Sequence, residues 1–251
     1  MTQTTPFVFL HGLTFDHRLW EPVLAALPEG TAAMAPDLPG HGGTPLLESP
    51  GLLPVVDHVH EAVVAAGFER PVMVGHSIAG VIATIYAAKH PAAGVVTVDV
   101  TMRFEPFAAG LRALRPQLEG PAFDAAWEPF KESMHLDGVP AEHRELVAAG
   151  DRASQEVVLC YQADLLERLD DVLGEREVMT EALRAERLPY LALFGREIDP
   201  DDRAWYAREI PYAVLEAWPV GHHFPHLEDP HAFVDRMTAF AAPAREAAPT
   251  G

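Results

Sequence analysis

At 251 residues and 49% hydrophobic content, the chain is long enough for one domain with a sizeable core, to which a helical insertion could be added. Its formal net charge of −19 argues against nucleic acid and anionic membrane surfaces as partners. The single cysteine, Cys160, excludes an internal disulfide framework, and with no leader-like segment or membrane-length apolar run we expect a soluble, cytoplasmic protein.

Strand-like and helical segments alternate along the N-terminal part of the chain. The strand-like runs are Phe7–Leu10, Thr31–Ala35, Val72–Val74 and Val95–Val98. Between the first two, Asp16 can cap a helix whose apolar face carries Trp20, Val23, Leu24 and Leu27. Pro54–Ala66 is a second amphipathic helix, which Gly67 ends, and a third runs from Ile78 to about Ala88. This alternation predicts a parallel sheet covered by helices on both faces.

The stretch from Arg103 to Arg187 contains no convincing strand, and we read it as several helices inserted into the core. Two further strand-like runs, Tyr190–Phe194 and Val214–Ala217, follow it. We therefore expect a core formed by residues 1–102 and 188–242, a helical insertion over 103–187, and a disordered tail rich in Ala and Pro over 243–251. Some apolar residues of the insertion should line a pocket between insertion and core, from the set Phe104, Phe107, Phe123, Trp127, Phe130, Met134 and Tyr161.

The segment Gly75-His76-Ser77-Ile78-Ala79-Gly80 stands between a strand-like run and a helix. A serine on such a tight turn, flanked by small residues, is typical of a nucleophile elbow, and the helix N-terminus behind it favours developing negative charge. The usual pattern has glycine two residues after the serine, and Ala79 is its smallest substitute. Taken alone, the segment also fits a small-residue turn with a solvated serine.

Three other motifs accompany this serine. They are His11-Gly12-Leu13 after the first strand, Asp37-Leu-Pro-Gly-His-Gly-Gly-Thr44, and Gly221-His-His-Phe-Pro-His-Leu-Glu-Asp-Pro230. In this order the four motifs closely resemble the α/β-hydrolase superfamily, from Phe7 to about Phe240. The resemblance implies the α/β-hydrolase fold, with a mainly parallel sheet, helices on both faces and an all-helical cap inserted at 103–187. It also implies that the usual first two strands are lacking.

The resemblance implies a catalytic triad in the order serine, acid, histidine, with Ser77 as the nucleophile. For the base we prefer His223, which lies five residues before Glu228 as in the family pattern. His222 is the alternative because it directly follows the glycine of the motif. We expect His226 to support the loop structurally.

The acid is open between two main positions. Asp199 lies four residues after Gly195, at the end of a strand where the family usually places its acid three residues on. Asp99, at the end of Val95–Val98, is the alternative acid, although an aspartate there is also commonly structural. We prefer Asp199, with Glu197 as a third candidate.

The oxyanion hole, by resemblance, consists of the backbone N–H groups of Leu13 and Ile78. We expect His11 to fix this loop by hydrogen bonding. The thirteen histidines show no clear metal-ligand spacing, and the glycine-rich segment Gly40–Gly43 lacks the phosphate-binding pattern, so we expect no metal and no cofactor.

The predicted function is that of a cofactor-free serine hydrolase, with a small, largely apolar ester, thioester or lactone as its substrate and an acyl-enzyme on Ser77. The same triad could cleave the carbon–carbon bond of a diketone-like substrate. A ligand receptor on a hydrolase scaffold is the alternative outside enzymes. The expected partner is a small-molecule substrate, and the oligomeric state stays open.

Overall fold

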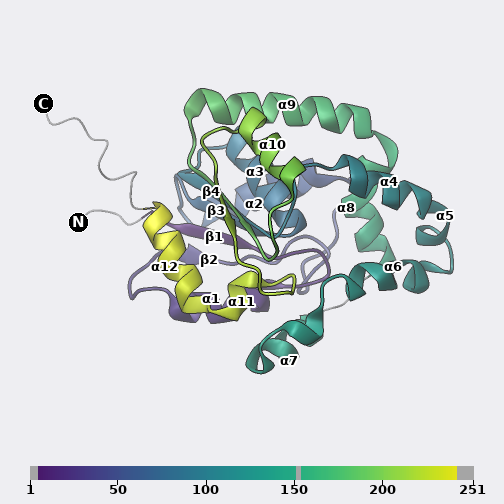
Figure 1. The fold of residues 1–251 in the computed structure, drawn as a ribbon, viewed down its shortest axis with the longest axis horizontal. Coiled ribbons are helices and arrows are strands. Elements are labelled where there is room, and N and C mark those ends of the chain that lie inside the picture. The colour runs from purple at the N-terminus through teal and green to yellow at the C-terminus, as the bar shows by residue number, and fades with distance from the viewer. Residues whose placement is uncertain (1–4, 151–153, 242–251) are drawn as a thin grey trace, which may run out of the picture.

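The computed structural model of the chain describes residues 5–150 and 154–241 (Figure 1). The tail expected over 243–251 lies outside these residues. In the described part, no helix combines the length and the apolar composition needed to cross a membrane.

A six-stranded parallel sheet forms the centre of the fold, which confirms the predicted class. Its strands are β1 (Phe7–Leu10), β2 (Ala33–Met34), β3 (Val72–His76), β4 (Gly94–Val98), β5 (Tyr190–Phe194) and β6 (Val214–Ala217). They lie in the order β2-β1-β3-β4-β5-β6, and every neighbouring pair is parallel. The edge strand β2 is shorter than predicted because only Ala33 and Met34 pair with β1.

Helices cover both faces of the sheet (Figure 1). Strand β1 shows why, since Val8 and Leu10 belong to one buried apolar cluster and Phe7 and Phe9 to another. The first cluster includes α2 (Leu52–Ala65), α3 (Ile78–Lys89) and α10 (Pro200–Glu209). The second includes α1 (Glu21–Ala26) and α12 (Pro230–Ala241). Strands buried on both faces need continuous apolar runs, as these strands have.

The predicted cap of Asp16 is present, although the helix it begins has two parts. The Asp16 carboxylate accepts a hydrogen bond from the backbone N–H of Arg18 at 3.0 Å. It begins a 3₁₀ turn over His17–Trp20, which continues as α1. This segment follows β1, and its 3₁₀ turn contacts that strand.

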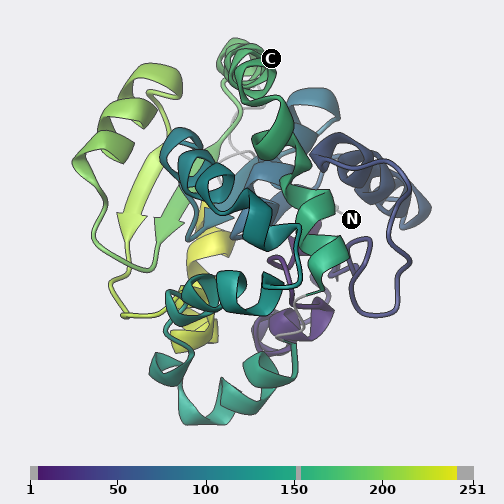
Figure 2. The same cartoon turned by 90° about the vertical axis from the view of Figure 1, so that its right-hand side faces the viewer.

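The stretch between β4 and β5 contains helices and no strand among its described residues. The helices are α4 (Glu105–Ala113), α5 (Arg115–Leu118), α6 (Phe123–Glu132), η2 (Leu136–Gly138), α7 (Ala141–Gly150), α8 (Gln155–Glu167) and α9 (Leu169–Glu186). Helices α4 to α8 lie beyond one end of the sheet, and Figure 2 shows them from that side. Helix α9 instead packs against α3 on a face of the sheet. The inserted segment therefore contributes to the helical layer as well as covering the strand ends.

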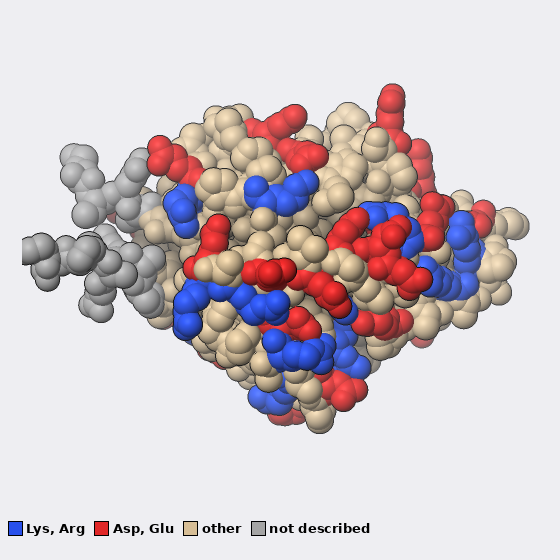
Figure 3. Space-filling view, turned by 90° about the horizontal axis from the view of Figure 1, so that it is seen from above, with Lys and Arg blue, Asp and Glu red and all other residues tan. Residues whose placement is uncertain are grey.

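The face that carries α9 has acidic and basic side chains interspersed (Figure 3). Ion pairs join α9 to α4 and to α10, in the pairs Arg176–Glu105 and Arg184–Glu209. Arg168, the N-cap residue of α9, pairs with Glu175 inside the helix. This pairing means that the arginines of the α9 face are matched by carboxylates despite the acidic composition of the chain.

Candidate active site

Ser77 occupies a strained turn between β3 and α3. Its φ of 55° and ψ of −133° lie outside the regions that non-glycine residues prefer. A Cβ added to Gly75 would lie 2.0 Å from the carbonyl oxygen of Ala79, so the turn requires glycine at that position. Ala79 itself is fully buried, and its methyl group fits the space where the usual pattern has glycine. The turn thus has the geometry of a nucleophile elbow.

His223 and Asp99 form a hydrogen-bonded pair. The Nδ1 atom of His223 lies 2.6 Å from Oδ2 of Asp99, and both side chains are largely buried. The backbone N–H of Gly195 donates to the other oxygen, Oδ1, at 2.8 Å. Burial alone would raise the pKa of Asp99, but the hydrogen bond and charge of His223 and the Gly195 N–H together bring that pKa below its usual value. Asp99 is therefore held ionised beside the histidine.

Asp99 follows β4, the strand next to β3, and so lies close to Ser77 across the sheet. The backbone N–H of Ser77 donates to Val98, the last residue of β4, at 2.8 Å. Asp99, like Ser77, has a positive φ, of 50°. Two strained non-glycine residues at the ends of adjacent strands are a common feature of functional sites.

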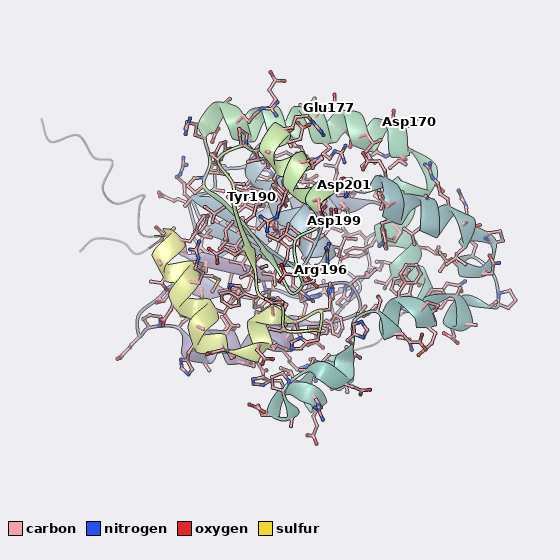
Figure 4. All side chains as sticks on the ribbon, in the orientation of Figure 1. Asp170, Glu177, Tyr190, Arg196, Asp199 and Asp201 are labelled. Carbon is pink, nitrogen blue, oxygen red and sulfur yellow. The ribbon has the colours of Figure 1, made fainter. Side chains whose placement is uncertain are left out.

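Asp199, the preferred acid from the sequence, is not brought to His223, whose carboxylate partner is Asp99. The Asp199 carboxylate accepts a hydrogen bond from the backbone N–H of Asp201 at 2.7 Å and caps α10. It also lies 3.7 Å from the Arg103 guanidinium, at the start of the helix where Figure 4 shows it. The extra residue after Gly195 makes Asp199 an N-cap, because an aspartate directly before a helix is the best acceptor for its free N–H groups. Glu197 is exposed in the same loop.

His222, the alternative base, has a structural environment. Its side chain is fully buried, its Nδ1 accepts from the backbone N–H of Phe224 at 3.1 Å, and its Nε2 lies 3.1 Å from Glu228. Glu228, which suggested the register in the sequence, therefore contacts His222 and not His223. His226 is also fully buried and packs on Trp20, with ring centroids 4.4 Å apart. Neither histidine reaches the Asp99 carboxylate.

The backbone of His223 is fixed from two sides. The side chain of His76 donates from Nε2 to the carbonyl oxygen of His223 at 2.7 Å. The N–H of His223 donates to the carbonyl of Met134, in the insertion, at 3.0 Å. Burial, followed by the charges of His223 and His226, holds the pKa of His76 well below its usual value, so His76 is a neutral donor. The sequence did not predict either contact, although His76 directly precedes the elbow serine.

The loop after β1 lies against the elbow. A Cβ added to Gly12 would be 3.2 Å from the Cβ of Ser77. His11 holds this loop as expected, because its Nδ1 donates to the Gly12 carbonyl at 2.9 Å and its Nε2 accepts from the backbone N–H of Leu38 at 2.9 Å. Desolvation, together with the nearby His41, lowers the pKa of His11 to about 4.

The two expected oxyanion donors lie at this junction of loop and elbow. Within the described residues, no hydrogen bond from the backbone N–H of Leu13 or Ile78 is present. Ile78 is the first residue of α3, where a backbone N–H has no partner within its own helix. Both groups are therefore available to a ligand.

A cavity of about 900 Å³ includes Ser77, Asp99 and His223 among its walls. Six of the seven apolar residues selected from the insertion also line it, namely Phe104, Phe107, Trp127, Phe130, Met134 and Tyr161. Phe123 does not line it; its ring is buried and stacks on Trp127. The remaining apolar walls come mainly from aliphatic residues of α2, α3 and α9. The site is thus a large apolar pocket with a serine, a histidine and a carboxylate inside it.

One group in the described residues has the side chains and spacing of a metal site. Ligand atoms of Asp16, His17 and Asp37 lie within 4.8 Å of one another. Asp16 is already paired with Arg18, and His17 Nδ1 lies 2.8 Å from Asp37. The carboxylates are therefore occupied by internal partners, and the group lies apart from the cavity walls.

Comparison with known proteins agrees with this architecture. The chain is 28% identical over 247 residues to 2-succinyl-6-hydroxy-2,4-cyclohexadiene-1-carboxylate synthase of Salmonella newport (strain SL254), covering 93% of this chain and 92% of that protein. Among solved structures, a putative aryl esterase from Burkholderia cenocepacia is similar, with a TM-score of 0.73 at 20% identity over 97% of this chain and 92% of the other. So is an AqdC variant that recognises and cleaves the ring of the Pseudomonas quinolone signal, with a TM-score of 0.76 at 17% identity over 97% and 93%.

A match to a family model identifies the family of this chain. Residues 7–236 match the model described as the alpha/beta hydrolase family. This match spans the sheet, the elbow, the insertion and the histidine loop. The chain belongs to the alpha/beta hydrolase family and is an enzyme of the α/β-hydrolase type.

Proposed function

We propose that the protein is a cofactor-free serine hydrolase that cleaves a small, largely apolar carboxylic ester, thioester or lactone. The observation that carries the proposal is the 2.6 Å contact between His223 and Asp99 in the cavity that also contains Ser77. A serine hydroxyl is a weak nucleophile at neutral pH, and it needs a base that a carboxylate orients.

In the proposed reaction, Ser77 attacks the substrate carbonyl and His223 takes the hydroxyl proton. Asp99 fixes the histidine so that Nδ1 carries a proton, and its charge stabilises the imidazolium that forms. The backbone N–H groups of Leu13 and Ile78 receive the developing oxyanion. His223 then protonates the leaving group, and a water molecule, activated in the same way, releases the acid from Ser77.

The walls of the cavity favour an uncharged ester over a carboxylate substrate. The two arginines of the walls are already paired with carboxylates, Arg103 at 3.0 Å from Asp201 and Arg196 at 3.2 Å from Asp202. The Salmonella relative is named for a product that bears a carboxylate. A substrate of that kind would have to compete with the internal carboxylates for these arginines. We therefore prefer ester hydrolysis to the chemistry of that relative.

The experiment combines turnover with active-site labelling. We expect the purified protein to hydrolyse p-nitrophenyl butyrate or hexanoate and to take up one fluorophosphonate per chain at Ser77. Ser77→Ala should lose both, with turnover reduced by about 10⁴-fold or more, because the triad acts as a unit. A Ser77→Ala protein that unfolds cooperatively and keeps most of its ester turnover would refute the serine mechanism. Turnover of a 1,3-diketone without ester turnover would instead favour carbon–carbon bond hydrolysis.

A further inference from the structure

A buried amide side chain lies in the cavity walls and takes no part in the proposed reaction. Gln162, on α8, is 3% exposed and lines the cavity. Its Oε1 is buried and has no hydrogen-bond partner among the described residues. In either orientation of the amide, the side chain offers both a donor and an acceptor. A buried amide without a partner destabilises the protein unless a ligand satisfies it.

A second glutamine on the same helix shows the ordinary arrangement. The Nε2 of Gln155 donates to the carbonyl oxygens of Leu118 and Gly120, at 2.7 and 3.0 Å, and so joins α8 to the end of α5. Other polar side chains in the cavity walls also have internal partners, such as the Tyr161 hydroxyl, which donates to Pro39 at 2.8 Å. Of the described residues in the walls, Gln162 and the Trp127 indole are the two with a buried polar side-chain atom that lacks a partner.

The charges around the cavity indicate what kind of group Gln162 would bind. The charged residues of the walls other than Asp99 have partners of opposite charge, in the pairs Arg103–Asp201, Arg196–Asp202, Lys89–Asp57, Asp164–Arg168 and Glu175–Arg168. Asp99 is hydrogen-bonded to His223 and Gly195. With these charges compensated internally, a charged ligand group would lose its hydration without gaining an unpaired partner. A neutral amide suits a neutral polar group.

We infer that Gln162 is a specificity-determining residue, which hydrogen-bonds an uncharged hydroxyl, carbonyl or amide group on the acyl part of an otherwise apolar substrate. This inference rests on the proposed ester hydrolysis and names its substrate class more closely. A site built to hydrogen-bond a substrate group discriminates strongly against the analogue without that group, because the buried amide is then left unpaired.

The test compares p-nitrophenyl hexanoate with a series in which one hydroxyl, oxo or acetamido group is moved along the acyl chain. We expect at least one substituted ester to exceed hexanoate in kcat/KM by about 10-fold or more in the wild-type enzyme. Gln162→Leu, which keeps the size but removes the amide, should lose this preference. Gln155→Leu is the matched control, with the same substitution on the same helix, and it should keep the preference.

Thermal unfolding supplies a readout independent of turnover. Gln162→Leu should leave the Tm unchanged or raise it, since no internal hydrogen bond is lost, whereas Gln155→Leu should lower it. A lowered Tm for Gln162→Leu, or a preference that survives this substitution, would overturn the inference, as would a wild-type enzyme with no preference across the series. If no ester is hydrolysed, the proposed function fails, and calorimetric Kd values for hexanamide and its substituted analogues decide the role of Gln162 separately.

Discussion

The imidazole of His76 donates a 2.7 Å hydrogen bond to the backbone carbonyl of His223, and thereby connects the elbow to the loop of the proposed base. The residue directly before the serine thus fixes the backbone of the residue that would take the proton of the serine. Because the donor is buried and neutral, its position depends on packing and not on pH over the neutral range.

Removing this donor should impair turnover without removing any reacting group. We expect His76→Leu to lower kcat by about 10-fold, because the base would be held less exactly and a buried carbonyl would lose its partner. His76→Gln, whose amide N–H can take the place of Nε2–H, should recover part of the loss. Steady-state kinetics over a range of pH is the measurement. If His76 positions His223, its replacement should change the acid limb of kcat/KM, whereas a purely structural role of His76 would leave that limb unchanged. Equal losses in the two variants would contradict the role of the hydrogen bond.

The two candidate acids should behave differently. Asp99→Asn should lower kcat by about 10³–10⁴-fold, because the amide can neither stabilise the imidazolium nor select the tautomer of His223. Asp199→Ala should keep near wild-type turnover and lose about 0.5–2 kcal/mol of stability, since α10 would lose its cap. Kinetics and urea unfolding of both variants separate these effects. A loss of turnover in Asp199→Ala as large as that in Asp99→Asn would contradict the geometry.

The neighbouring histidines offer a second comparison. We expect His223→Ala to lose as much turnover as Ser77→Ala. His222→Ala should mainly lose stability, by about 1–3 kcal/mol, because the buried backbone N–H of Phe224 would be left without its acceptor. Turnover measured at a temperature where both variants are folded distinguishes the two residues. The reverse order of losses would make His222 the base.

Glycine at position 12 should be essential to the loop beside the elbow. A Cβ there would lie 2.9 Å from Nδ1 of His76 and 3.2 Å from Cβ of Ser77, so the loop would have to shift. We expect Gly12→Ala to lower kcat by about 10²-fold, the cost of one displaced oxyanion donor. Gly110→Ala, on α4 with open space around the added Cβ, is the matched control and should keep full turnover. Full activity in Gly12→Ala would show that the loop does not form the oxyanion hole.

Buried histidines should make the fold sensitive to mild acid. Burial holds the pKa of His11 at about 4 and that of His226 well below its usual value. Because the unfolded chain has its histidine pKa near 6.5, it takes up protons first as the pH falls, and stability decreases from about pH 6.5 towards pH 4. His226→Phe removes one such group without removing a hydrogen bond, since neither ring nitrogen has a partner among the described residues.

The expected result is a shallower fall in stability with acid for His226→Phe than for the wild type. Urea midpoints between pH 7.5 and pH 5 measure it, and His231→Gln, at an exposed position, should follow the wild-type curve. Parallel curves for the wild type and His226→Phe would mean that His226 is not the source of the acid sensitivity.

The fold was largely predictable because its strands are continuous apolar runs with clear ends. Tyr190–Phe194 lies between Pro189 and Gly195, and the structure begins and ends β5 at those residues. The elbow was predictable for a similar reason, since a tight turn restricts Gly75 and Ala79 to small side chains in any context. The edge strand β2 was overestimated because its length depends on pairing with β1, which local sequence does not encode.

The position of the proposed acid was not predictable, because an aspartate after a strand can orient a histidine or cap the next helix with the same local sequence. Asp199 precedes Pro200, a residue common at the first position of a helix, and this was the available sign that it is a cap. The contacts of His76 and Met134 with the backbone of His223 join residues far apart in the chain, and no spacing rule identifies them.

The Gly195 amide that holds Asp99 directly follows β5, and the loop beyond it, from Arg196 to Asp199, supplies no group to the proposed triad. The segment from Arg196 to Asp199 therefore has no role in the proposed reaction, although Arg196 lines the cavity. Directed evolution could lengthen or exchange this loop to reshape the entrance for bulkier acyl groups, while the serine, the base and the acid remain on elements that such a library leaves untouched.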